Sequence, residues 1–211
     1  MEIETNSNRV GVSWLNNWRF CPYKMLLTDI LQLHAEKSPK QLAGIAAHQL
    51  LDDMTIPCEE DLKTLVKNTI LLGHPTLPIR DAKVENERMI GRIDELFLSQ
   101  QSIRIIEDKP RSRTGIIFPS HKLQANGYAT VFLSMFPICQ NIPLSVVIRD
   151  EITLEEMWEL PFSTDSESEV MSAVAQIEQI RDGTLNASPT KRSHNCRGCS
   201  CNYLCEYYTR R

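Results

Sequence analysis

The sequence contains no apolar run long enough to span a bilayer or to serve as a secretory signal. We therefore expect a soluble, cytoplasmic protein with no membrane partner. Internal repeats and low-complexity tracts are also missing, which excludes repeat architectures and long disordered segments. The net charge of −4 excludes a protein coated with positive charge for indiscriminate binding to nucleic acid, so any such contact has to be local.

Apolar residues, in contrast, are plentiful: 42% of the 211 residues are hydrophobic, enough for one compact domain over residues 1–211. Their periodicity predicts a mixed α/β core that begins with helices and continues with strands. Ser13 is the expected N-cap of the first helix. We expect helices at 13–27, broken at Pro22, and at 39–54, 59–72, 119–135 and 166–181, with strands at 83–90, 90–98, 103–109, 144–149 and 155–160.

Two acids and an amine fall on the two strands of a predicted hairpin. Residues 90–98 and 103–109 are rich in strand-forming residues and are separated by a short polar turn. Pairing the serines at the two ends of this turn places Asp94 directly opposite Glu107. Because side chains alternate along a strand, Lys109 lies on the same face as Glu107. Three charged groups therefore converge.

Two carboxylates that face each other repel, so the arrangement requires a cation or an ammonium group beside them. Two carboxylates can hold a hard cation such as Mg²⁺ and still leave room for a phosphate oxygen and a water molecule. Lys109 is placed to orient or deprotonate that water, while Asp108 points to the other face of the sheet. The set of residues predicts metal-dependent cleavage of phosphodiesters; the alternative is a solvated hairpin face.

Four cysteines crowd together behind a Ser/Thr/Pro-rich linker at 188–193. In a reducing compartment, clustered cysteines bind metal more often than they form disulfides. The spacing C-x2-C-x5-C lacks one ligand, which Cys21 near the other end of the chain could supply to an iron–sulfur cluster. A local zinc site that uses Cys201 remains open, and Cys58 and Cys139 are interpreted as ordinary thiols. The clustered residues are Cys196, Cys199, Cys201 and Cys205.

Together these residues resemble a known family. The motifs are His48, Gly91–Asp94, Glu107–Lys109, Gln124 with Tyr128, and the one-plus-three cysteines. They are similar to RecB-like nucleases of the PD-(D/E)XK superfamily and, within it, to the small CRISPR-associated exonucleases, the fourth family in the Cas naming scheme. The resemblance, over residues 21–205, implies a restriction-endonuclease-like core with a mixed central sheet flanked by helices. It also implies a cysteine-cluster lobe that joins segments 10–35 and 188–211.

The resemblance also implies roles for individual residues. Asp94, Glu107, the backbone carbonyl of Asp108 and His48 would bind Mg²⁺ or Mn²⁺, and Lys109 would serve the attacking water. Cys21, Cys196, Cys199 and Cys205 would hold a [4Fe-4S] cluster, with zinc as the alternative. Gln124 and Tyr128, four residues apart on one helix face, would contact the substrate. A local basic patch would add further substrate contacts and consists of Lys109, Arg111, Arg113, His121 and Lys122.

The function implied by the resemblance is a metal-dependent DNA exonuclease that acts on single-stranded DNA or overhangs. Members of this family trim DNA ends during the capture of new CRISPR spacers, together with the integrase and its dimeric partner. One alternative is a stand-alone RecB-like repair nuclease with the same chemistry. An alternative of another class is a non-catalytic iron–sulfur or zinc scaffold that binds DNA.

Overall fold

The computed structural model describes residues 8–33, 42, 61–75, 77–110, 116–191, 193–197 and 199–208. Apart from Leu42, the helix expected at 39–54 lies outside the described residues, and His48 lies outside with it. Arg111, Arg113 and Cys58 lie outside them too. In the part of the chain that is described, no helix is both long and apolar enough to cross a membrane.

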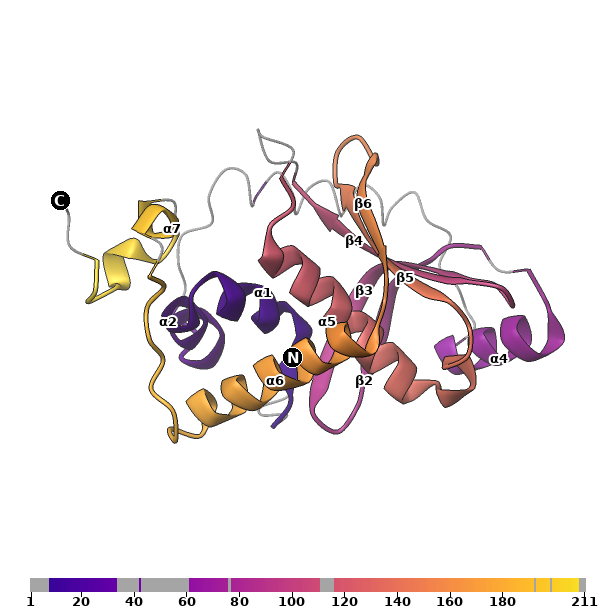
Figure 1. Cartoon of the computed structure of the whole chain (residues 1–211), viewed down its shortest axis with the longest axis horizontal. Coiled ribbons are helices and arrows are strands. Elements are labelled where there is room, and N and C mark those ends of the chain that lie inside the picture. Colours follow the sequence, from indigo (N-terminus) through magenta and orange to yellow (C-terminus); the bar gives the residue numbers. More distant parts are fainter. Residues whose placement is uncertain are drawn as a thin grey trace, which may run out of the picture.

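A six-stranded mixed sheet forms the centre of the molecule (Figure 1). Its strands are β1 (Val10–Gly11), β2 (Ile79–Glu85), β3 (Met89–Leu98), β4 (Ile103–Lys109), β5 (Leu144–Asp150) and β6 (Glu156–Pro161). β3 pairs with β1, β2 and β4, and the sheet continues through β5 to β6. The β1–β3 and β4–β5 pairs are parallel and the others are antiparallel. The predicted mixed α/β core is therefore confirmed.

The helices lie mainly against one face of this sheet. They are α1 (Val12–Phe20), α2 (Pro22–Met25), η1 (Leu26–Ile30), α4 (Leu62–Leu72), α5 (Pro119–Met135), η2 (Pro137–Cys139), α6 (Thr164–Arg181), α7 (Ser193–Arg197) and η3 (Asn202–Leu204). The connection between the parallel strands β4 and β5 contains α5, as parallel pairing requires a crossover. α1 and α6 both pack against α5, and they also contact the sheet, α1 at β3 and α6 at β1 (Figure 1).

The hairpin of β3 and β4 has the predicted register. Glu95 pairs with Ile106, and a hydrogen bond of 3.0 Å from the backbone N–H of the first serine of the turn to the carbonyl of the last closes the turn. The pairing ends at Glu95 and Ile106, and beyond it the Asp94 side chain accepts a hydrogen bond of 2.8 Å from the Asp108 backbone N–H. The local turn chemistry therefore determines the register of the paired part of the hairpin, at whose end Asp94 and Glu107 lie close together.

Several predicted element boundaries were wrong: β2 begins at Ile79 and not at 83, α4 begins at Leu62 and not at 59, and α6 begins at Thr164 and not at 166. The N-cap of α1 is Gly11, not Ser13, because the chain leaves the β1–β3 pairing directly into the helix. The strand expected at 83–90 is interrupted, since β2 ends at Glu85 and a turn follows it. In that turn the side chain of Asn86 accepts two backbone N–H hydrogen bonds of 2.8 and 2.9 Å, a local alternative to strand pairing.

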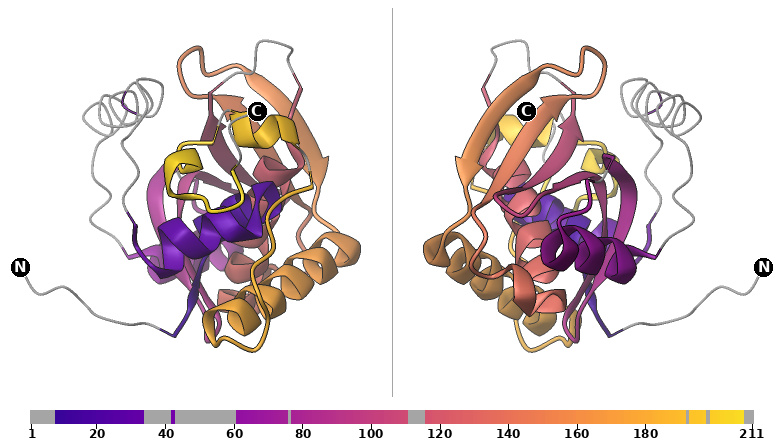
Figure 2. Two further views of the ribbon diagram at one scale, coloured as in Figure 1. Left: turned by 90° about the vertical axis from the view of Figure 1, so that its left-hand side faces the viewer. Right: turned by 90° about the vertical axis from the view of Figure 1, so that its right-hand side faces the viewer.

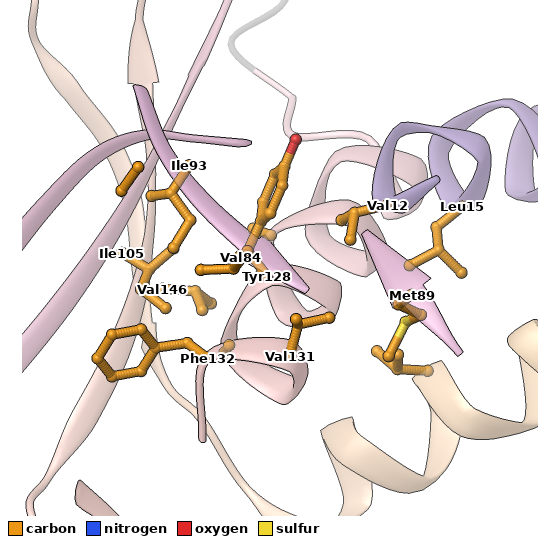
Figure 3. Packing of buried hydrophobic residues seen from close by; sticks show 14 of the residues in the cluster. Val12, Leu15, Val84, Met89, Ile93, Ile105, Tyr128, Val131, Phe132 and Val146 are labelled. Carbon is orange, nitrogen blue, oxygen red and sulfur yellow. The ribbon is translucent and has the colours of Figure 1, made fainter. Parts of the chain in front are cut away.

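The hydrophobic core lies between α5 and the sheet. Phe132 and Val131 of α5 and Ile93, Ile105 and Val146 of the sheet are all fully buried (Figure 3). Burial of such side chains stabilises the fold by about 1.5–3 kcal/mol each. The core therefore clamps α5 against β3, β4 and β5.

The opposite face of the sheet carries a buried ion network that joins four strands. Arg149 of β5 donates to Asp108 at 2.7 and 3.0 Å and to Glu95 at 2.9 and 3.2 Å. Arg80 of β2 donates to Glu95 at 2.6 Å. These side chains are at most 10% exposed. Asp108 thus points away from Glu107, as predicted, and its charge is neutralised.

Replacing Arg149 should destabilise the protein strongly. Arg149→Met leaves two buried carboxylates short of a partner, and we expect a loss of about 3–5 kcal/mol in the free energy of unfolding, measured with urea. Arg104→Met is the matched control, because the Arg104 side chain is 30% exposed and its ion pairs contribute less than about 1 kcal/mol. Equal losses in the two variants would contradict the importance of the buried network.

Candidate active site

The candidate active site lies at the C-terminal end of β4, on the face covered by α5. Lys109 Nζ lies 2.5 Å from Glu107 Oε1, and the two side chains are 17% and 3% exposed. Asp94, across the hairpin, accepts a 2.8 Å hydrogen bond from the backbone N–H of Asp108. The structure therefore brings together the two acids and the amine singled out from the sequence.

The site holds more negative charge than its own residues neutralise. Burial, and then the charge of Asp94, raise the pKa of Glu107 to about 8, although Lys109 acts against this rise. Burial alone would lower the pKa of Lys109, but the neighbouring carboxylates outweigh it and raise that pKa. No described N–H or O–H group donates to Glu107 Oε2, and the Asp94 carboxyl is close enough to Glu107 to hydrogen-bond it when one of the two acids is protonated. Two adjacent carboxyl groups of which one is buried fit a divalent cation.

Gln124 and Tyr128 share one face of α5, as their spacing predicted, and both are buried. Gln124 Nε2 donates to the Tyr128 hydroxyl at 3.2 Å. Burial, and then the charges of Glu107 and Asp94, raise the pKa of Tyr128 well above its usual value. Figure 3 shows the hydroxyl pointing away from the core side chains. The pair therefore forms the helical wall of the site.

Gly91, at the start of the Gly-x-x-Asp motif, provides room for this wall. A Cβ atom at Gly91 would lie 2.7 Å from Cε1 of the Tyr128 ring and 3.0 Å from Cβ of Val12. Real side chains do not tolerate the first of these distances. The glycine thus lets the tyrosine ring pack directly against β3.

Two further residues lie beside Lys109. Burial, and then the charge of Lys109, lower the pKa of His121 to about 4, so this imidazole is neutral. The backbone N–H of Glu151 donates to the Lys109 carbonyl at 3.2 Å, and the Glu151 charge contributes to the raised pKa of Lys109. The basic patch in the sequence pointed to His121. No local pattern pointed to Glu151, because only the parallel pairing of β4 with β5 brings it to the site.

A second candidate centre is a cavity of about 230 Å³ between α2 and the C-terminal segment. The described cysteines are all free thiols, and five of them line it: Cys21, Cys196, Cys199, Cys201 and Cys205. The backbone N–H of Thr190 donates to Cys21 Sγ at 3.4 Å. Burial raises the pKa of Cys199, and a hydrogen bond from the Cys201 backbone N–H acts against this rise.

The N-terminal and C-terminal segments that line this cavity contact each other directly. Asn195 Nδ2 donates to the Phe20 carbonyl at 3.2 Å, and the Tyr23 hydroxyl donates to Glu206 at 3.0 Å. The Tyr23 ring also meets the edge of Tyr207, with 4.9 Å between centroids. Figure 2 shows the yellow C-terminal segment lying against indigo α1 and α2. Pro22 ends α1 and begins α2, which leaves Cys21 in extended backbone between them.

Within the described residues, no group of three or more His, Cys, Asp and Glu side chains could hold a single metal ion as it stands. The thiols of Cys21, Cys199 and Cys205 are nevertheless near enough to Cys196 to raise its pKa, in addition to the effect of burial. These four thiols therefore interact with one another around the shared cavity.

Comparison with known proteins identifies the fold but not the family. No family model matches the chain, and no curated protein matches it. The solved structure of SSO0001 is 16% identical, with a TM-score of 0.51 over 97% of this chain and 89% of that one. The two proteins therefore share a fold.

Two weaker similarities are to exonucleases. One is a candidate exonuclease from Eubacterium rectale, 10% identical over 94% of this chain and 93% of that one, with a TM-score of 0.47. The other is the alkaline exonuclease LHK-Exo from Laribacter hongkongensis, 10% identical over 84% and 89%, with a TM-score of 0.37.

The buried carboxylate should make the stability of the metal-free protein fall as the pH rises from 6.5 to 8. The pKa of Glu107 is about 8 in the folded chain, against an ordinary value of 4.5, so protonation stabilises the fold and ionisation removes that stabilisation. The expected slope is about 1 kcal/mol per pH unit. Below pH 6.5, neutral His121 acts in the opposite sense, because its pKa is depressed.

Urea unfolding in a chelating buffer measures this slope. Glu107→Gln should flatten it, whereas Glu159→Gln, in an ion pair with Arg104 at the surface, should keep the wild-type slope. A wild-type profile as flat as that of Glu107→Gln would contradict the raised pKa of Glu107.

Proposed function

We propose that this chain is a metal-dependent DNA nuclease whose active site consists of Asp94, Glu107 and Lys109. The observation that carries the proposal is the pair of adjacent acids, of which Glu107 is buried and receives no hydrogen bond at Oε2 from a described N–H or O–H group, with one ammonium group 2.5 Å from Glu107. A non-catalytic scaffold has no need for this arrangement, because facing carboxylates destabilise a sheet.

Asp94 and Glu107 would hold the ion, together with the backbone carbonyl of Asp108 and, as the family resemblance implies, His48. Bound Mg²⁺ or Mn²⁺ would supply a Lewis acid for the phosphate and lower the pKa of a water molecule. Lys109 would orient this water and stabilise negative charge that develops on the phosphate. Gln124 and Tyr128 would direct polar groups at the substrate from α5, and Arg111 and Arg113 would contact its backbone.

The finer proposal is an exonuclease that acts on single-stranded DNA or overhangs and processes DNA ends during CRISPR spacer acquisition, with the integrase and its dimeric partner. It rests on the resemblance of the motifs. A stand-alone RecB-like repair nuclease would use the same chemistry with other partners. Genes for the integrase and its partner beside the gene for this chain would favour the first of these roles.

We also propose that Cys21, Cys196, Cys199 and Cys205 hold a [4Fe-4S] cluster with a structural role. Three of these thiols come from the C-terminal segment and one from the junction of α1 and α2. The cluster would therefore join two segments that are already in contact. The alternative is a zinc site that uses Cys201 in place of Cys21.

End-labelled single-stranded DNA tests the nuclease. With Mg²⁺ or Mn²⁺, we expect the wild type to release short products, and Glu107→Gln and Lys109→Met to lower the rate by about 10²–10⁴-fold, because each removes a group that acts on the attacking water. Circular single-stranded DNA should resist cleavage, since an exonuclease needs an end. Glu159→Gln is the matched carboxylate control and should keep full activity.

Three outcomes would contradict the assignment. Unchanged activity in both active-site variants would refute the site. A wild-type protein that is inactive with both Mg²⁺ and Mn²⁺ would refute the nuclease function. Efficient cleavage of circular single-stranded DNA would refute the exonuclease activity.

Metal analysis of protein purified without oxygen tests the cluster. We expect a brown protein with visible absorbance and bound iron, lost in Cys199→Ser and Cys21→Ser but kept in Cys139→Ser, since buried Cys139 lies outside the cysteine cavity. A colourless protein with stoichiometric zinc that Cys201→Ser loses and Cys21→Ser keeps would instead establish the local zinc site.

A further inference from the structure

A groove of about 540 Å³ lies between the end of α1 and the beginning of α5. Arg19 and Phe20 of α1 and Lys24 of α2 line one side, and Phe118 and His121 line the other. None of these residues has a role in the proposed chemistry at the acids.

The groove leads to the active site along α5. His121, Gln124 and Tyr128 follow each other at helical spacings of three and four residues, so they lie on one face of the helix. Gln124 and Tyr128 form the wall beside the acids, and His121 extends this face by one turn into the groove. The charge of Lys109 acts on His121, which places the groove beside the catalytic amine.

The lining combines the two features that recognise a single strand of nucleic acid. Phe118 is 48% exposed, and its ring meets His121 edge to face, with 5.4 Å between centroids. Exposed aromatic rings bind nucleic acid by stacking on bases, which does not depend on sequence. A base at the end of a single strand is free to stack on a protein ring, whereas a base in a duplex has to be unstacked first.

The cations of the groove are available to a ligand. Arg19 lies 3.9 Å from Glu169, and both side chains are about half exposed, so this ion pair is weak. Lys24 Nζ lies 5.1 Å from the centre of the Phe20 ring, which holds the ammonium at the groove. In a chain with a net charge of −4, such local cations are required to bring phosphates near two carboxylates.

We propose that this groove binds the single-stranded part of the DNA substrate, with Phe118 stacked on a base beside the scissile phosphate and with Arg19 and Lys24 on phosphates further along the strand. This inference rests on the proposed nuclease function and assigns the selection of single strands to named residues. The strand would run along the groove between the end of α1 and the beginning of α5 before it reaches Lys109.

Binding of a single-stranded oligonucleotide that contains 2-aminopurine tests the groove. Ca²⁺ replaces Mg²⁺ so that the full-length protein binds without cleavage, and stacking on Phe118 quenches the fluorescence. Phe118→Leu keeps an apolar side chain but removes the ring, and we expect roughly tenfold weaker binding and loss of part of the quenching. Phe118→Tyr should restore both. Leu72→Ala, an exposed apolar residue at the end of α4, is the control.

The salt dependence of binding tests the cations. Arg19→Ala with Lys24→Ala removes two phosphate contacts, which should reduce the slope of log K against log salt by about 1.4. Lys67 lies on α4, at the opposite end of the molecule from α2 (Figure 1). Lys67→Ala is therefore the control and should leave the slope unchanged.

The outcomes separate the groove from the proposed function. If the wild type cleaves DNA and these variants bind with wild-type affinity, quenching and salt slope, the groove does not bind the substrate. The proposed nuclease function is then unaffected. A wild type that neither binds nor cleaves single-stranded DNA would overturn both. Thermal unfolding of each variant identifies loss of fold, and the Tyr variant then decides whether the ring itself is required.

Discussion

The repulsion between two carboxylates held close together at one end of a sheet is the constraint on which the other features depend. Glu107 is buried, Asp94 lies beside it, and Lys109 balances only part of their charge. The repulsion destabilises the folded protein in the absence of a cation. The same repulsion favours binding of a cation at the site. The rest of the structure has to hold these groups together.

The far face of the sheet provides that support. Asp108 lies between the two active-site residues of β4 but points the other way, into the pair of arginines that also binds Glu95. Its backbone N–H donates to Asp94. One residue thus anchors the strand on one face and orients an acid on the other, so the two ionic environments are mechanically linked.

A single helix serves the core, the site and the groove. Phe132 of α5 is fully buried in the core, Tyr128 forms the wall of the site, and His121 reaches the groove. Gly91 and Gly127 have no Cβ atoms, and this lets α1 and β3 approach α5 closely. Because the helix is clamped along its length, a substrate in the groove would be held in a defined position relative to Lys109.

The sequence by itself determined the features that depend on short-range rules. The turn before Ile103 set the register of the hairpin, strand alternation set the faces of Glu107 and Asp108, and the helical repeat placed Gln124 beside Tyr128. Only the tertiary structure decided that Arg149 neutralises the far face and that Glu151 comes to Lys109. It alone also formed the groove and the cysteine cavity. These depend on the parallel pairing of β4 with β5 and on contacts between segments far apart in the chain, which no local pattern encodes.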